Sequence, residues 1–231
     1  MTKIIVIIPA RSGSKSIKNK NLKKVKGISL LVRAIKFAKK IKIVDKIIVT
    51  TDSPIYQSIA IKNGADCPFI RPKKYASDSS LDIEAFYHCL NWLKIECNYD
   101  SDICINLRPT YPIRKIKDFI LAINKIKKNK GIDSIKSICK IPFPLEKTWI
   151  IKKNNYLKNS LQHNSKELWN YPRQKLPSYY VQNGNIDIVR SKVILQKKKM
   201  SGLKIYPVIQ NHFYDIDNLK DLRLEKKFKN F

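Results

Sequence analysis

The sequence predicts an α/β protein in which helices cover both faces of a doubly wound, mostly parallel sheet. Strand-like and helix-like segments alternate over residues 1–140, the order expected when a crossover helix follows each strand. The first strand-like run, Lys3–Ile8, is almost wholly apolar, as in a strand that is buried on both faces. Right-handed crossovers would bring the carboxyl ends of the strands to one edge, where open α/β sheets bind ligands.

Hydrophobic spacing and the residues that start and stop each segment give the predicted elements. Leu31, Ile35 and Ala38 recur at helical spacing, and the following helix is expected to end at Gly64. In chain order we predict strand Lys3–Ile8, helix Leu30–Lys40, strand Lys46–Thr50, helix Pro54–Asn63, strand Pro68–Ile70, helix Leu81–Ile95, strand Ser101–Leu107, helix Ile116–Lys128, strand Asp133–Cys139, strands Tyr179–Val189 and Leu203–Val208, and a closing helix Asn218–Lys229.

The alternation stops between Ile141 and Tyr180. This stretch contains a hairpin signal, Asn154–Asn155, within Trp149–Leu157. It also gathers prolines and tryptophans, namely Pro142, Pro144, Pro172, Pro177, Trp149 and Trp169. We therefore predict a single domain over residues 1–231 with an inserted lobe at about residues 141–180.

The chain carries a formal net charge of +29, which has two readings. A polyanionic partner, either nucleic acid or a nucleotide, would explain it. Compositional drift would also explain it, because Lys, Ile and Asn are all abundant and share A/T-rich codons. The lysines are scattered along the chain rather than clustered, which favours drift and solvated helix faces over a nucleic-acid groove.

No apolar run reaches the roughly 18 residues of a membrane span or resembles a signal-peptide core. The five cysteines form no CxxC pair, which argues against a zinc site or a disulfide framework. These features favour a cytoplasmic protein without a membrane partner. The three histidines form no catalytic or ligand pattern, and His88 lies within a predicted helix, which indicates a structural role.

A basic loop follows the first predicted strand. Small residues there would let backbone N–H groups approach a triphosphate, while Arg11 and Lys15 could pair with its oxygens. Lys18, Lys20 and Asn21 continue the loop. Its spacing is not that of a Walker A loop, and a solvated turn is the alternative.

Three further segments lie at or beyond predicted strand ends. Asp52 is either a nucleotide-site acid or part of a helix N-cap. Arg71 and Asp78 could contact phosphate or base, although Asp78 could instead cap the next helix. In the segment Arg108–Arg114, two prolines stiffen a loop that holds two arginines, which suits anion recognition.

Two carboxylates close the set of candidate residues. Asp215 and Asp217 are two residues apart after the last predicted strand, so in an extended chain both would point the same way. Such a pair can hold Mg²⁺ against a phosphate. The alternative is a helix N-terminus, at which Asp217 would act as the cap.

Together these segments resemble the CMP-acylneuraminate synthetase family. The resemblance rests on motifs in the family's order over nearly the whole chain: IPARSGSK (Ile8–Lys15) with KNL (Lys20–Leu22), TTDS (Thr50–Ser53), GADCPFIRP (Gly64–Pro72) with ASDSS (Ala76–Ser80), RPTYPIR (Arg108–Arg114), YVQNGNIDIV (Tyr180–Val189) and YDIDNLKDL (Tyr214–Leu222). It implies the α/β fold with a protruding lobe that builds a homodimer. It also implies a cytidylyltransferase that joins CMP from CTP to an acidic sugar, using Mg²⁺ and releasing pyrophosphate.

The resemblance assigns a role to most of the candidate residues. The catalytic set is Arg11, Lys15, Lys20, Asp215 and Asp217, of which Asp215 and Asp217 hold the metal. The nucleotide-binding set is Ala10, Ser12, Gly13, Asn21, Arg71 and Asp78. In the sugar-binding set, the resemblance assigns Asn183. The sequence adds to this set Arg108 and Tyr111, which differ from the family's motif, and Arg173 and Gln174, which lie in a segment that is not typical of the sialic-acid enzymes.

The sequence departs from the family pattern at three places: the first loop, the segment Arg108–Arg114, and the segment Trp169–Pro177. The first loop reads Ser12–Ser16 where the family has GGSKG, and Arg108 stands where the family's QPTSPLR has its Gln. Because that Gln lies near the sugar in the sialic-acid enzymes, the sugar stays open among sialic, legionaminic and pseudaminic acid-like compounds, another acid or a sugar phosphate.

Two other functions remain as alternatives. One is a nucleotidyltransferase that uses another nucleoside triphosphate or a sugar 1-phosphate. The other is a basic nucleic-acid-binding protein, which would leave the ordered motifs unexplained.

Overall fold

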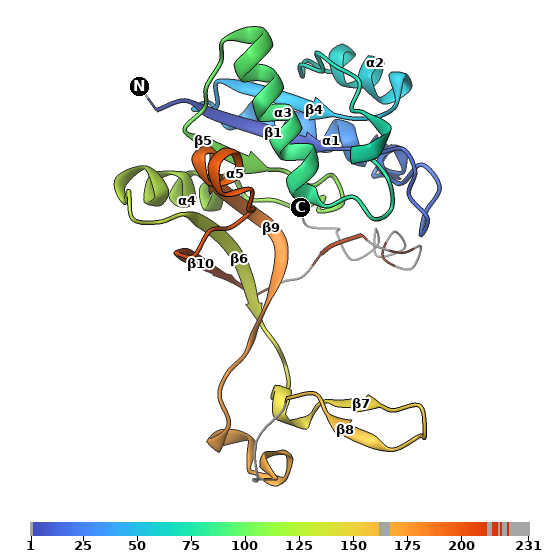
Figure 1. The fold of residues 1–231 in the computed structure, drawn as a ribbon, viewed down its shortest axis with the longest axis vertical. Coiled ribbons are helices and arrows are strands. Elements are labelled where there is room, and N and C mark those ends of the chain that lie inside the picture. Colours follow the sequence, from blue (N-terminus) through green and yellow to red (C-terminus); the bar gives the residue numbers. More distant parts are fainter. Residues whose placement is uncertain (1, 162–166, 212–213, 217, 219–220, 222–231) are drawn as a thin grey trace.

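The computed structural model describes residues 2–161, 167–211, 214–216, 218 and 221. Its central sheet has six strands in the order β10-β6-β9-β5-β1-β4, with helices on both faces and a lobe that projects from one side (Figure 1). Among the described residues, no helix is long and apolar enough to cross a membrane.

The elements of the sheet and its helices have these bounds. The strands are β1 (Ile4–Pro9), β4 (Lys46–Thr50), β5 (Ile103–Asn106), β6 (Ser134–Lys140), β9 (Tyr180–Arg190) and β10 (Ile205–Gln210), and β2 (Lys24–Val25) pairs with β3 (Ile28–Ser29) in a separate hairpin. The helices are α1 (Leu30–Lys40), α2 (Pro54–Lys62), α3 (Asp82–Cys97), α4 (Ile116–Lys128) and α5 (Ser191–Lys197), with short 3-10 turns η1 (Lys20–Leu22) and η2 (Lys73–Tyr75).

The prediction of a mostly parallel sheet is confirmed. β1 is parallel to both β4 and β5, and β10 is parallel to β6. β9 alone runs antiparallel, against β5 on one side and β6 on the other. This reversal arises because β9 is the returning strand of the lobe, which leaves the sheet after β6.

The sheet separates two apolar layers. Side chains of β1 point alternately into the two layers. Ile4, Val6 and Ile8 pack with α1 and α4, whereas Ile5 and Ile7 pack with α3 and α5. A strand with period-two geometry that is buried on both faces needs apolar residues at every position, which explains the uninterrupted run in the sequence.

One predicted strand, Pro68–Ile70, is wrong. Backbone hydrogen bonds to the β4 region are made by residues on either side of this segment. Asp66 exchanges bonds of 2.8 Å with Ile47 and Val49 of β4, and Arg71 N–H donates to the carbonyl of Thr51, directly after β4, over 2.7 Å. Pro68 has no N–H to donate, so a continuous ladder does not form between these contacts. The other predicted strands and helices agree with described elements to within a few residues, except that most of the closing helix, Asn218–Lys229, lies outside the described residues. Helix α5 and the β2–β3 hairpin were not predicted.

The lobe occupies the chain between β6 and β9 and stands away from the helical layers on the long ends of those two strands (Figure 1). Its hairpin is confirmed, with Asn155 at φ 61 in the turn. It contains η3 (Leu145–Lys147), β7 (Trp149–Ile151), β8 (Leu157–Asn159), η4 (Leu168–Asn170) and η5 (Arg173–Lys175). The use of this lobe for dimerisation stays a prediction.

Candidate active site

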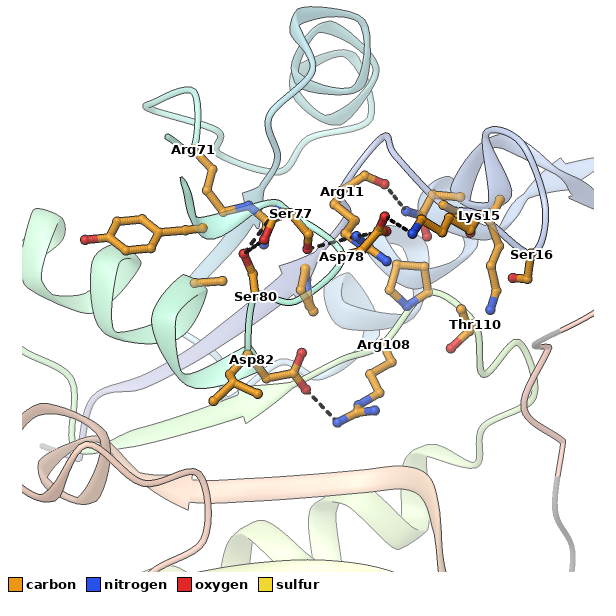
Figure 2. Close-up of a pocket in the computed structure, with 18 residues that line it drawn as sticks. Arg11, Lys15, Ser16, Arg71, Ser77, Asp78, Ser80, Asp82, Arg108 and Thr110 are labelled. Atoms are coloured by element: carbon orange, nitrogen blue, oxygen red, sulfur yellow. Dashed lines mark hydrogen bonds and ion pairs between the residues drawn. The ribbon is translucent and has the colours of Figure 1, made fainter. Parts of the chain in front are cut away.

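A cavity of about 520 Å³ opens at the carboxyl edge of the sheet, where the loops after β1 and β5 face the segment that leads into α3 (Figure 2). Five of its lining side chains are cationic and two are acidic. These charged residues are Arg11, Lys15, Lys20, Arg71, Arg108, Asp78 and Asp82. The excess of positive charge suits a polyanionic ligand such as a nucleoside triphosphate.

Asp52 fixes the loop after β1. Its carboxylate accepts hydrogen bonds from the Ser12 backbone N–H over 2.8 Å and from the Ser12 hydroxyl over 2.7 Å. The neighbouring Ser53, not Asp52, caps α2 by accepting from the Tyr56 N–H. Ala10 and Ser12 are thereby tied to the end of β4, and the loop they begin is held over the cavity.

Gly13 lies in the same loop. A Cβ at this position would meet no heavy atom within 4 Å, and its φ is not in the left-handed region. The described structure therefore does not itself require glycine here, whereas a phosphate group approaching the backbone closely would.

One carboxylate holds two of the predicted catalytic cations. Arg11 Nη1 lies 2.8 Å from Asp78 Oδ1, and Lys15 Nζ lies 2.9 Å from Asp78 Oδ2 (Figure 2). The hydrogen bonds from Lys15 and Arg11 lower the pKa of Asp78 below its usual range. All three side chains are partly or largely exposed, so a nucleotide entering the cavity could compete with Asp78 for both cations.

Arg71 is the most buried of the cationic side chains that line the cavity. Its side chain is 4% exposed, and its Nε and Nη2 have no hydrogen-bond acceptor within the part of the chain that the structure describes. Burial lowers the pKa of this guanidinium. Lys20 and Asn21 are buried nearby, and the Asn21 amide donates to the Arg11 carbonyl over 3.0 Å. Buried donors without acceptors are costly, so Arg71 is suited to a ligand that supplies them.

The loop after β5 places only part of the predicted sugar-binding set at the cavity. Arg108 lines it and donates from Nη2 to Asp82 Oδ2 over 2.7 Å (Figure 2). Tyr111 is fully buried beneath the loop, where the Arg114 guanidinium lies 5.8 Å from its ring centroid. In this conformation Tyr111 supports the loop from below, and Arg108 faces the cavity.

Asp215 lies next to the cavity wall. The following residue, Ile216, donates its N–H to the carbonyl of Thr110, a lining residue, over 2.9 Å. Oδ1 of Asp215 is buried and has no hydrogen-bond partner among the described residues. Gly184, which has φ +75, lies beside this carboxylate: a Cβ added there would meet Asp215 Oδ2 at 3.7 Å, an ordinary contact distance.

These observations fit a Mg²⁺ ligand, because a shielded carboxylate oxygen without a donor suits a hard cation. Asp217 lies outside the described residues. Elsewhere in the described chain, no group of three or more His, Cys, Asp or Glu side chains is arranged to hold a metal.

The other predicted sugar-binding residues lie away from the cavity. The Asn183 side chain is buried in an amide network, where it donates to Gln210 Oε1 over 2.9 Å. Arg173 and Gln174 are exposed in η5 of the lobe and do not line the cavity in the described part of the chain. Within the described chain, Asn21, Arg71 and Asp78 of the nucleotide-binding set line the cavity, and Arg108 is the one member of the sugar-binding set that does. Ala10, Ser12 and Gly13 lie in the loop after β1 and are not lining residues.

Sequence reasoning missed two features of this region. Asp82 forms an ion pair with Arg108. From the sequence, its position in the first turn of α3 indicated only an acidic residue that stabilises the helix N-terminus. Lys136 on β6 forms a buried ion pair with Asp187 on β9, and Asn106 donates to the same carboxylate over 3.0 Å. A charged residue within each of two apolar strands was the available signal, but the partner could be named only once the strands were paired.

Proteins of similar sequence align with nearly the whole chain. It is 32% identical over 226 residues to the N-acylneuraminate cytidylyltransferase of Escherichia coli O18:K1:H7, covering 96% of this chain and 51% of that protein. The chain thus spans about half the length of that relative. It is 30% identical to the CMP-N,N'-diacetyllegionaminic acid synthase of Legionella pneumophila, covering 97% of this chain and 95% of the relative. It is 26% identical to a pseudaminic acid cytidylyltransferase of Campylobacter jejuni, again covering 97% and 95%.

Solved structures share the fold. A CMP:2-keto-3-deoxy-manno-octonic acid synthetase complexed with CTP superposes with a TM-score of 0.71 at 17% identity, covering 98% of both chains. The 4-diphosphocytidyl-2C-methyl-D-erythritol synthase of Anaerococcus prevotii superposes with a TM-score of 0.65 at 16% identity, also covering 98% of both. At these identities the likeness establishes the fold alone.

The family model described as cytidylyltransferase matches residues 5–229, which include every cavity residue named above. The match confirms the resemblance seen in the ordered motifs, and the chain belongs to the cytidylyltransferase family.

Proposed function

We propose that this protein transfers CMP from CTP to the hydroxyl of an acidic, nonulosonic-type sugar and releases pyrophosphate. The observation that carries the proposal is the cationic cavity at the carboxyl edge of the sheet, in which Arg11 and Lys15 are held ready by Asp78. The names of the relatives support both substrate classes, since they are cytidylyltransferases or CMP-sugar synthases for sialic, legionaminic and pseudaminic acids.

In the proposed reaction the sugar hydroxyl attacks the α-phosphorus of CTP in line. A bond forms between the sugar oxygen and the α-phosphorus, and the bond from the α-phosphorus to the bridging oxygen breaks. The hydroxyl proton is lost, and pyrophosphate leaves with the electron pair. Negative charge grows on the bridging and leaving oxygens, so the protein contributes mainly by positioning and by neutralising charge.

The cations of the cavity would share this work. Arg11 and Lys15 lie at its mouth on the loop after β1 and would exchange Asp78 for phosphate oxygens. Arg71, buried with unpaired N–H groups, would receive acceptors from the nucleotide. Lys20, which lines the same cavity, adds further positive charge.

We assign the metal site to Asp215 together with Asp217. When bound, Mg²⁺ would neutralise phosphate charge and favour the deprotonated sugar hydroxyl. Support comes from the buried, unpartnered Oδ1 of Asp215 beside Gly184.

Arg108 is the residue we assign to the sugar side. It lines the cavity, and its guanidinium already binds one carboxylate, that of Asp82, through a hydrogen bond. A planar guanidinium recognises carboxylates well, so Arg108 suits a sugar acid better than a neutral sugar.

We also propose a homodimer built through the lobe. The hairpin exposes apolar side chains to an unusual degree, with Ile151 72% and Tyr156 71% exposed. Covering such a surface favours association. A second copy would also be needed to bring Arg173 and Gln174 of the lobe to a sugar site at the cavity. The five cysteines are all free, which supports a reducing, cytoplasmic location.

The proposal is tested by measuring pyrophosphate release with Mg²⁺ from CTP, GTP, UTP and ATP. Each nucleotide is offered with sialic, legionaminic, pseudaminic or 3-deoxy-octulosonic acid, or with several sugar 1-phosphates. We expect turnover with CTP and one of the acids. Arg11→Ala should lose about 10²-fold or more in kcat/KM, by the scale of single electrostatic contacts to a transition state.

The matched control for Arg11→Ala is Lys94→Ala. Lys94 lies on α3, forms an exposed ion pair with Asp100 and does not line the cavity. Turnover only with another triphosphate or a sugar phosphate would move the function to a different nucleotidyltransferase. Steeply salt-dependent binding to nucleic acid, without turnover of any sugar, would reject the proposal.

A further inference from the structure

A second cavity, of about 350 Å³, lies beside α1 and shares no lining residue with the active-site cavity. None of the described residues that line it is acidic: five are cationic and five are apolar. The cations are Lys26, Arg33, Lys36, Lys40 and Arg114. Three of the chain's lysines and two of its arginines thus lie around one cavity.

Helical spacing and one tight turn bring these cations together. Arg33, Lys36 and Lys40 are three and four residues apart on α1, so they form one stripe along the helix. Lys26 and Gly27 form the two-residue turn of the β2–β3 hairpin, with φ of 49 and 75, as a type I′ turn requires. Arg33 donates to the Val25 carbonyl, which ties this hairpin to the helix.

The cluster carries unmet hydrogen-bonding capacity. Nε of Arg33 and Nε of Arg114 are buried, and neither has a partner within the described parts of the chain. Buried donors without acceptors cost free energy, so an anion with several oxygens would satisfy them.

The remaining wall of the cavity is apolar. It is formed by Val25, Ile28, Phe37, Pro112 and Ile113. A bare inorganic ion would leave this wall in contact with water, whereas a ligand with both a phosphate and an apolar or planar moiety would cover it. The volume is within the range of small-molecule sites.

We propose that this cavity is a second binding site that takes a small phosphate ester, with the chemistry of a nucleoside mono- or diphosphate. The phosphate is bound by the α1 stripe and Arg114, and the apolar moiety lies against the hairpin and the loop Pro112–Arg114. The inference does not rest on the proposed reaction, because no residue of the active-site cavity takes part in it.

The choice of variants follows from the contacts. Arg114 donates to the Arg108 carbonyl and Arg33 to the Val25 carbonyl, so changing either would disturb neighbouring structure. Lys36 and Lys40 are exposed at the cavity rim, and a Lys36→Ala/Lys40→Ala variant leaves those bonds in place. The matched control is Lys39→Ala/Lys42→Ala, which removes the same charge at two exposed lysines that do not line the cavity.

The experiment is equilibrium dialysis of the full chain against labelled CMP and labelled ADP, counting sites per chain. We expect the Lys36→Ala/Lys40→Ala variant to have one site fewer than the Lys39→Ala/Lys42→Ala control, or that site weakened by about tenfold or more, since charge-assisted contacts to phosphate are lost. Its pyrophosphate release at saturating substrate should match that of the control.

Two outcomes would overturn the inference. One is the same number and strength of CMP and ADP sites in both double variants. The other is found with a labelled single-stranded RNA 12-mer: if the cavity variant loses only oligonucleotide binding and keeps all CMP and ADP sites, the cationic cluster serves a nucleic acid instead.

Discussion

Arg11 and Asp78 form an ion pair of 2.8 Å that joins the loop after β1 to the segment before α3 across the mouth of the active-site cavity. Lys15 binds the other oxygen of the same carboxylate. Arg11 and Lys15, which are predicted to bind the triphosphate, are therefore already held together by the Asp78 carboxylate. Exchanging that anion for phosphate oxygens requires little rearrangement of the loop, because the cations stay in place.

Asp78→Asn should weaken CTP binding without unfolding the protein. Exposed ion pairs contribute little to stability, so we expect Tm to change little. Without the Asp78 carboxylate to hold Arg11 and Lys15 together, KM for CTP should rise by roughly three- to tenfold, with a smaller change in kcat. Steady-state kinetics and thermal unfolding measure both, and Asp100→Asn, which breaks the exposed pair with Lys94, is the control. An unchanged KM for CTP would show that Asp78 does not organise the two cations.

Asp215→Asn should lose about 10²-fold or more in kcat, by the scale of single electrostatic contacts in catalysis. The cause would be a weakened Mg²⁺ site, so the Mg²⁺ concentration for half-maximal turnover should rise as well. Glu96→Gln, at an exposed position on α3, removes the same charge away from the cavity and should change neither quantity. Unchanged turnover of Asp215→Asn at every Mg²⁺ concentration would remove Asp215 from the metal site.

His88→Gln should flatten the dependence of stability on pH. The His88 ring packs 4.8 Å from that of Phe69, and burial, with Arg71 and Lys74 nearby, lowers its pKa below 6.5. His88 is therefore protonated at a higher pH in the unfolded chain than in the folded one. The stability from neutral His88 is therefore present above about pH 6.5 and is lost as pH falls toward the folded-state pKa. Urea midpoints between pH 5 and 8 measure this, and parallel curves for the two proteins would contradict it.

Ile151→Asp should convert the proposed dimer to a monomer. Ile151 is 72% exposed on β7 of the lobe, and a charge there would be desolvated in an apolar interface. Light scattering after size exclusion measures the mass. Ile61→Asp is the matched control, since Ile61 is 57% exposed on α2, far along the chain from the lobe. A wild-type protein that runs as a monomer would reject the proposed interface, and so would a dimer that survives Ile151→Asp.

Much of the fold could be predicted from local pattern. The apolar run at β1 indicated burial on both faces, and Leu31, Ile35 and Ala38 marked the inner face of α1. The error at Pro68–Ile70 arose because a short apolar segment favours a strand, whereas one proline prevents the continuous ladder. The antiparallel direction of β9 could not be predicted, since strand composition does not encode direction.

The amino-acid sequence alone identified the charged residues near the strand ends, and hence the cationic character of the active-site cavity. Arg11 and Lys15 were identified because they stand in a loop beyond an apolar strand, and Arg71 because it follows the apolar segment Pro68–Ile70. Only the tertiary structure decided which of these residues meet. It paired Arg11 with Asp78, 67 residues away. It buried Tyr111 below the loop that carries Arg108 and gathered the stripe of cations on α1 into a separate cavity. Contacts of this kind depend on chain crossings and on packing between distant segments, so they are fixed by the assembled core and cannot be read from neighbouring residues.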